Sequence, residues 1–170
     1  MIKARPFTSL AAIAVFRQLD PSDQLEAELV RGAPASSLDL FADWHAAARG
    51  CLVNLAIETA GGTPFAVLAL AHTGVAGVAE AALLARDHAR FRRPLAELAV
   101  LIRARMPGWC RENGVRRVEA RCHVEHPTAP RLLRNIGFQM EAVMGGFGGH
   151  GRAAFYQFAT LFPAHPSPAD

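Results

Sequence analysis

Three strand-like segments that run into one long helical segment constrain the fold of this chain more than any other feature. The strand segments span 51–59, 64–72 and 78–86, and an Ala-Gly-Gly turn joins the first two into a hairpin. Residues 93–113 then carry apolar side chains at helical spacing. Pro107 is expected to end or kink this helix. This order predicts a mixed sheet with helices on its faces.

The remaining segments extend the same pattern on both sides. Asp20 before Pro21 resembles an N-cap with proline in the first turn and predicts a helix through about Val30. The other expected elements are a helix at 38–49, a strand at 115–124, a helix at 128–135 and a hairpin of strands 138–147 and 153–162. We therefore expect an α/β (α+β) fold in one domain, residues 1–162, with a flexible tail at 163–170 that contains three prolines.

Composition excludes several classes of protein. The chain has 170 residues, 51% of them hydrophobic and 19% charged, which suits a single packed core and not a disordered chain. No apolar run approaches the roughly 18 residues of a membrane span. Three widely spaced cysteines predict reduced thiols in a cytoplasmic protein, not a disulfide framework.

Residues 131–138, Arg-Leu-Leu-Arg-Asn-Ile-Gly-Phe, carry the most specific motif. Leu132, Leu133 and Ile136 form one apolar stripe of a short helix. Gly137 permits the left-handed conformation that ends a helix, and Phe138 begins the next strand. A helix stop before a strand occurs in many α/β folds, so the motif gains specificity from its place between a strand and a terminal hairpin.

In that setting the segment resembles the Gcn5-related N-acetyltransferase (GNAT) superfamily. Its common frame is Asn-x-x-Ala-x-x-x-Tyr-x-x-x-Gly-Phe, and the matching positions here are His126, Ala129, Leu133, Gly137 and Phe138. The resemblance implies a mixed, mostly antiparallel sheet flanked by helices on both faces. It also implies an acyltransferase that moves an acetyl or other acyl group from acyl-CoA to an amine, with acyl-CoA as co-substrate.

The resemblance places the acyl-CoA site between the third strand and the long helix. The strand end, Leu84, Ala85 and Arg86, would offer a backbone N–H to the thioester. The family's pyrophosphate loop, Gln/Arg-x-x-Gly-x-Gly/Ala, corresponds to Phe91, Arg92, Arg93, Pro94, Leu95 and Ala96. Pro94 replaces the central glycine and has no N–H to donate, so we expect the neighbouring arginines to compensate. The other interpretation is a solvated basic turn whose proline starts a helix.

Two residues are candidates for proton transfer. Glu80 is the only acid in its strand and matches the position of the catalytic glutamate in some GNAT lysine acetyltransferases. Its alternative role is that of an outward-facing residue on a half-exposed strand. The family's tyrosine is Leu133 here, so His126, or His123 nearby, is the candidate donor to the leaving thiol. The spacing of His123 and His126 does not favour a metal site.

Two further functions compete with acyl transfer. A branch of GNAT-like proteins of tailed phages and prophages also lacks the glycine-rich loop, and this chain resembles that branch over 87–160, which favours a structural or binding protein without catalysis. Nucleic-acid binding ranks last because aromatic residues make up only 8% and the arginines are scattered. The acceptor amine, a small molecule or a protein, is not encoded in any motif. The early strands and the terminal hairpin are compatible with a homodimer.

Overall fold

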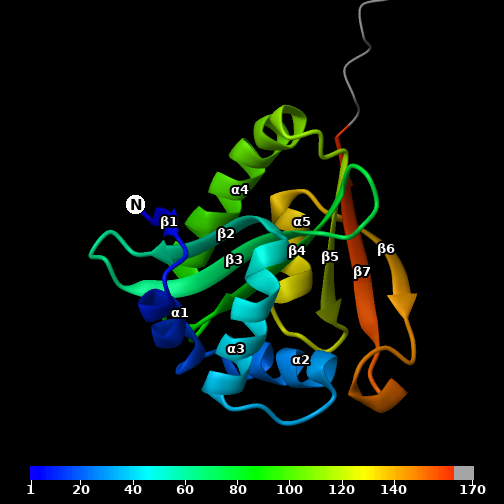
Figure 1. The fold of residues 1–170 in the computed structure, drawn as a ribbon, viewed down its shortest axis with the longest axis horizontal. Helices are drawn as coiled ribbons and strands as arrows, with labels where there is room; N and C mark the ends of the chain where they lie inside the picture. Colours follow the sequence, from blue (N-terminus) through cyan, green and yellow to red (C-terminus); the bar gives the residue numbers. More distant parts are fainter. Residues whose placement is uncertain (163–170) are drawn as a thin grey trace, which may run out of the picture.

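A seven-stranded sheet forms the centre of the protein, described over residues 1–162 by a computed structural model (Figure 1). The expected tail at 163–170 lies outside the described residues. The strands are β1 Lys3–Pro6, β2 Cys51–Glu58, β3 Pro64–His72, β4 Val78–Ala85, β5 Arg117–His123, β6 Gln139–Met144 and β7 Phe155–Leu161. Their order is β1-β2-β3-β4-β5-β7-β6, and only β4 and β5 pair in parallel. The expected mixed, mostly antiparallel sheet is confirmed.

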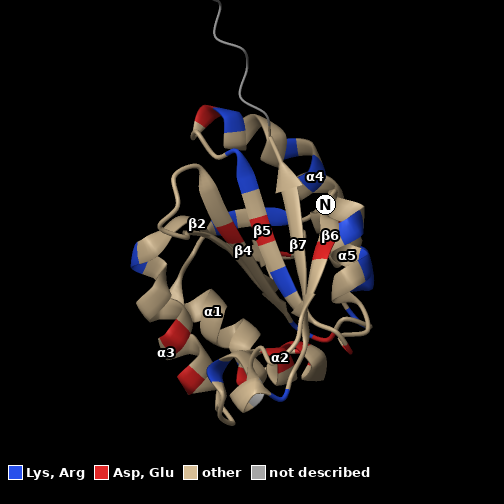
Figure 2. Ribbon diagram, turned by 90° about the vertical axis from the view of Figure 1, so that its right-hand side faces the viewer, with Lys and Arg blue, Asp and Glu red and all other residues tan. Residues whose placement is uncertain are grey.

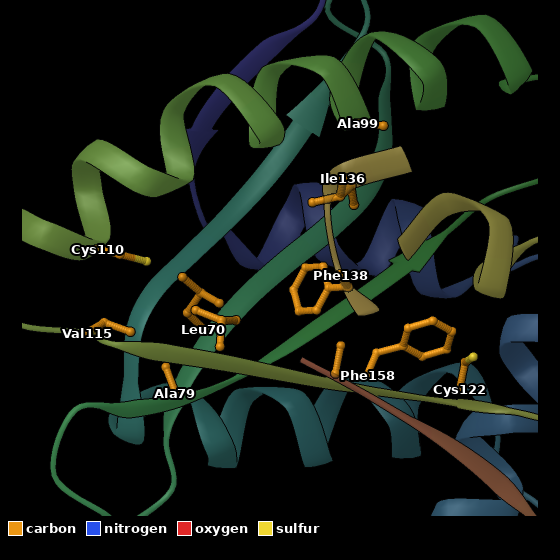
Figure 3. Packing of buried hydrophobic residues seen from close by; sticks show 11 residues of the cluster. Leu70, Ala79, Ala99, Cys110, Val115, Cys122, Ile136, Phe138 and Phe158 are labelled. Carbon is orange, nitrogen blue, oxygen red and sulfur yellow. The ribbon is translucent and has the colours of Figure 1, made fainter. Parts of the chain in front are cut away.

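Five helices cover the two faces of this sheet. They are α1 Ser9–Phe16, α2 Pro21–Arg31, α3 Ser37–Ala47, α4 Arg92–Glu112 and α5 Ala129–Ile136. Side chains alternate between faces along a strand, and in β3 Val67 packs with α1 and α3 while Leu70 packs with α4 and α5. Figure 3 shows the second of these cores, where Phe158 of β7 and Phe138 meet Ile136 and Ala99. None of the helices in the described part of the chain is long and apolar enough to span a membrane.

Local signals in the sequence account for two of the helix ends. Asp20 caps α2 through a hydrogen bond from the Ser22 N–H at 3.0 Å, with Pro21 in the first turn. Gly137 ends α5 at a φ of 118°, which is the predicted left-handed stop.

Helix α4 does not end at Pro107, and one strand was not anticipated. Helix α4 continues through Pro107 to Glu112 because its N-terminal half and Cys110 stay packed in the core. Strand β1 was not anticipated, since it is a four-residue edge strand whose residues are all exposed.

Candidate active site

Strands β4 and β5 separate in the middle of the sheet. Their parallel pairing covers only Val78–Arg117 to Ala81–Ala120, whereas β4 stays paired with β3 to Ala85 and β5 stays paired with β7 to His123. A cleft of ≈ 2170 Å³ lies at this opening. Leu83 and Leu84 both line it although neighbouring residues of a strand face opposite sides of a sheet. The cleft is therefore accessible from both faces of the sheet.

Helix α2 lies across the open ends of the two strands. The Ala85 N–H of β4 donates to Asp23 Oδ2 at 2.6 Å, and the His123 N–H of β5 donates to Glu26 Oε2 at 2.8 Å. Asp23 and Glu26 are three residues apart, so they lie one helical turn from each other on the same side of α2. Because β4 and β5 separate here, these two N–H groups have no partner in the neighbouring strand. The two carboxylates of α2 accept their hydrogen bonds instead.

Asp23 is also the centre of a buried network with two histidines. Its Oδ1 lies 2.9 Å from His126 Nε2 and 3.1 Å from His88 Nε2, and the Asp23 side chain is 7% exposed. Burial raises the pKa of Asp23, but hydrogen bonds from His126 and His88 outweigh it and hold the pKa below its usual value. Burial lowers the pKa of His88, but its contacts with Asp23 and Asp20 outweigh that effect and raise it. The shifts of Asp23 and His88 thus both favour the charged forms of these two groups.

His126 has both ring nitrogens engaged. Its Nδ1 accepts hydrogen bonds from the backbone N–H groups of Thr128 at 3.3 Å and Ala129 at 3.0 Å, at the start of α5. The ring proton then lies on Nε2 and points to Asp23. A residue with both nitrogens satisfied and a side chain 3% exposed has no proton free for a leaving thiol. In this geometry His126 links Asp23 of α2 to the start of α5, and its role as proton donor stays a prediction.

The three residues of the network also have the spacing of a metal site. One ligand atom from each of Asp23, His88 and His126 lies within 4.8 Å of the others. A metal ligand must offer an unprotonated nitrogen. Because Nδ1 of His126 accepts two N–H groups, its Nε2 carries the proton and has no lone pair for a metal. The residues therefore do not fit a metal ion in this arrangement.

Glu26 is the half-buried carboxylate of the cleft that has no cationic partner among the described residues. Burial raises its pKa to about 7, while the hydrogen bond from the His123 N–H lowers it to a smaller extent. A carboxylate with this pKa is partly ionised at neutral pH and can exchange protons with a ligand.

On β4, the N–H groups predicted to contact the thioester either face away from the opening or already donate to another group of the protein. The Arg86 N–H donates to the Phe65 carbonyl at 2.8 Å, and the Ala85 N–H donates to Asp23. N–H groups alternate between the two edges of a strand, so the N–H of Leu84 faces β3 and that of Leu83 faces the opening. Leu83 lines the cleft, and the sequence analysis did not single out its N–H.

The predicted pyrophosphate loop divides into two groups. Arg92, Leu95 and Ala96 line the cleft together with Leu84 and Ala85. Arg86, Phe91, Arg93 and Pro94 are not among the lining residues. Phe91 is a core residue that stacks on Phe65 with ring centroids 5.4 Å apart.

Helix α4 offers an incomplete N-terminal anion site. Leu95 is the first residue of the helix whose N–H bonds back, to the Phe91 carbonyl at 2.9 Å. Before it, Arg92 and Arg93 retain N–H groups that can bind an anion, whereas Pro94 has none. Arg92 adds a side-chain cation on the cleft side.

Glu80 lies on β4 where its strand still pairs with β5. Its carboxylate forms an ion pair with Arg121 of β5, and its side chain is 38% exposed. Figure 2 looks onto this part of the sheet, where charged segments follow β4 and β5 and the helices α1 and α3 lie to one side. Glu80 therefore lines the cleft as half of an ion pair, not as an isolated acid.

Sequence reasoning missed Asp23, Glu26 and His88. A signal was present, because acids at positions 20, 23 and 26 share one side of the predicted helix 20–30. Their partners are distant in sequence, so the chemistry of these acids could not be inferred from the spacing alone.

The fold of this chain is similar to that of solved acetyltransferases. A GNAT-family acetyltransferase from Bacillus anthracis superimposes with a TM-score of 0.70 at 14% identity, covering 94% of both chains. The ribosomal-protein-S18-alanine N-acetyltransferase from Escherichia coli superimposes with a TM-score of 0.69 at 14% identity, over 100% of this chain and 99% of that one. This is the GNAT fold.

A further neighbour shows the GNAT fold with its co-substrate. A GNAT phosphinothricin acetyltransferase from Sinorhizobium meliloti, in complex with acetyl-CoA, has a TM-score of 0.67 at 15% identity and covers 98% of this chain and 94% of its own. No protein-family model and no curated protein matches the sequence. At these identities the likeness establishes the fold alone.

Proposed function

We propose that this protein is an N-acyltransferase that moves an acyl group from acyl-CoA to an amine. The observation that carries the proposal is the cleft between the separated strands β4 and β5, open to both faces of the sheet. One face can admit the acyl-CoA thioester and the other the amine, so the two reactants meet without a covalent enzyme intermediate. Solved neighbours of the same fold include acetyltransferases bound to acetyl-CoA.

The chemistry follows from the groups around the cleft. The amine nitrogen attacks the thioester carbonyl, the carbon–sulfur bond breaks, and CoA leaves as a thiolate that takes up a proton. The N–H of Leu83, on the free edge of β4, is suited to stabilise the oxyanion. Arg92 and the free N–H groups of the first turn of α4 are suited to the pyrophosphate.

Replacing Arg92 by glutamate tests the acyl-CoA site. We expect wild-type protein to bind acetyl-CoA with a dissociation constant below roughly 1 mM, and Arg92→Glu to weaken binding at least about tenfold, because a cation is lost and an anion faces the phosphates. The matched control is Arg111→Glu, an exposed arginine in the last turn of α4 and outside the cleft lining, which should bind almost as wild type does. The measurement is calorimetric titration with acetyl-CoA; equal losses in the two variants would contradict the assignment.

A binding or structural protein with the GNAT fold but without catalysis, of the kind found in phages and prophages, is the second candidate. Two observations favour it. Asp23 occupies the Ala85 N–H at the strand end where the family contacts the thioester, and Pro94 removes a donor from the phosphate turn. Wild-type protein that binds acetyl-CoA more weakly than about 1 mM would support this candidate over the enzyme.

A further inference from the structure

Transfer to an amine needs a group that removes a proton, and the cleft contains several titratable residues. An amine is mostly an ammonium ion at neutral pH, and an ammonium has no lone pair with which to attack. The base must therefore lie in the cleft, carry a free acceptor atom and have a pKa near the working pH.

Most of the acids of the cleft are already committed to protein partners. Asp23 accepts from Ala85, His88 and His126, and Asp20 accepts from the N–H groups of Ser22 and His88. Among the surface pairs, Asp43 is held by Arg31 and Glu80 by Arg121. Each of these carboxylates already accepts from a cation or from N–H donors of the protein.

Glu26 differs from them in geometry. One carboxylate oxygen is anchored by the His123 N–H, which fixes the side chain at the end of β5. The other oxygen, Oε1, makes no hydrogen bond to any described residue. Glu26 therefore presents one free acceptor atom at the opening between β4 and β5.

The surroundings of Glu26 indicate what it can receive. The ring of His123 packs on Phe155 at 5.5 Å between centroids, and Phe155 packs on Phe147 at 5.0 Å. Both phenylalanines line the cleft, as do Ala27 and Val30 of α2. An apolar wall beside a single carboxylate suits a cation that carries an apolar group.

We propose that Glu26 binds the ammonium group of the acceptor and removes its proton, and that the acceptor is a primary amine with an apolar or aromatic substituent. This inference rests on the proposed N-acyltransferase function. The ammonium gives one proton to the Glu26 carboxylate, and the free amine attacks the thioester carbonyl carbon. Collapse of the tetrahedral intermediate breaks the carbon–sulfur bond, the second nitrogen proton passes to the CoA thiolate, and Glu26 returns its proton to water.

The test compares Glu26→Gln with Glu80→Gln, using acetyl-CoA and 2-phenylethylamine and following release of the CoA thiol. The amide introduced by Glu26→Gln retains an oxygen for the His123 N–H, so α2 stays anchored while the base is lost. We expect Glu26→Gln to lower kcat by about 10²–10⁴-fold with the affinity for acetyl-CoA unchanged. Glu125→Gln, an exposed acid just beyond β5, serves as control and should stay within about twofold of wild type.

The pH profile supplies a readout that a structural role would not move. Because the base acts only when ionised, the wild-type kcat should rise with pH through about 7 and then level off. This rise should be absent in Glu26→Gln and retained in Glu125→Gln.

The outcomes separate the two claims. Wild-type protein that releases CoA while Glu26→Gln keeps its rate and pH profile overturns the role of Glu26, and loss of activity in Glu80→Gln alone assigns the base to Glu80. Wild-type protein that releases no CoA with 2-phenylethylamine or with spermidine overturns the proposed function itself. Transfer to spermidine but not to 2-phenylethylamine overturns the inferred acceptor class.

Discussion

Replacing Asp23 by asparagine is expected to lower the free energy of unfolding by about 3–5 kcal/mol, the range for breaking a buried ion pair from one side. Asp23 accepts the Ala85 N–H on one oxygen and faces two histidine nitrogens with the other. An asparagine has one acceptor oxygen and an NH₂ group. In either orientation its NH₂ faces a buried donor, and both histidines lose the carboxylate they contact. Urea denaturation at neutral pH measures the change.

Asp43→Asn is the matched control for this variant. Asp43 also pairs with a cation, at 3.0 Å from Arg31, but its side chain is 54% exposed. Exposed pairs contribute between 0 and about 1 kcal/mol, so the same chemical change should have little effect there. If Asp23→Asn lowers the free energy of unfolding by less than about 1 kcal/mol, the buried network does not hold α2 against the strand ends.

Replacing Gly148 by alanine is expected to destabilise the fold by about 2–4 kcal/mol, because an added Cβ meets backbone atoms that cannot move aside. At Gly148 the Cβ would lie 2.9 Å from the Leu29 carbonyl oxygen of α2 and 3.2 Å from the Phe155 ring. The residue also has a φ of 66°, where any side chain is strained. The close approach packs the loop between β6 and β7 against α2, beside the aromatic wall of the cleft.

Gly146→Ala distinguishes the steric contact of the added Cβ from the backbone strain of a positive φ. Gly146 has a similar φ of 72°, but the nearest atom to its added Cβ is 3.9 Å away. We therefore expect Gly146→Ala to lower the free energy of unfolding by about 1–2 kcal/mol, through backbone strain alone. Thermal unfolding of both variants measures the difference. Equal losses of stability in Gly148→Ala and Gly146→Ala would contradict the close packing of this loop on α2.

The parts of the fold that could be predicted from sequence are those decided by neighbours in the chain. Asp20 with Pro21 specifies the start of α2, and Gly137 specifies the end of α5, through contacts within a few residues. The hairpin β2–β3 follows from two apolar segments and the Gly-containing turn between them. Each of these depends on propensity and on local hydrogen bonds, which the sequence displays directly.

The parts that could not be predicted depend on contacts between distant residues. Asp23 bonds Ala85, 62 residues away, and His126, 103 residues away, while Glu26 bonds His123 across 97 residues. The resemblance to the family frame directed attention to His126 as a donor, yet its role here depends on two N–H groups and on Asp23. Likewise, which of Arg92 and Arg93 faces the cleft depends on the rotation of α4, which the motif does not determine.

The most direct test of the account is amine-dependent release of CoA by the wild-type protein. Acetyl-CoA is incubated with 2-phenylethylamine, with spermidine and without an amine, free thiol is followed with time, and the products are examined by mass spectrometry. The account predicts thiol release that requires both the protein and the amine, together with the N-acetylated amine as product. Thiol release no faster than without protein, for both amines and at saturating acetyl-CoA, would contradict an N-acyltransferase.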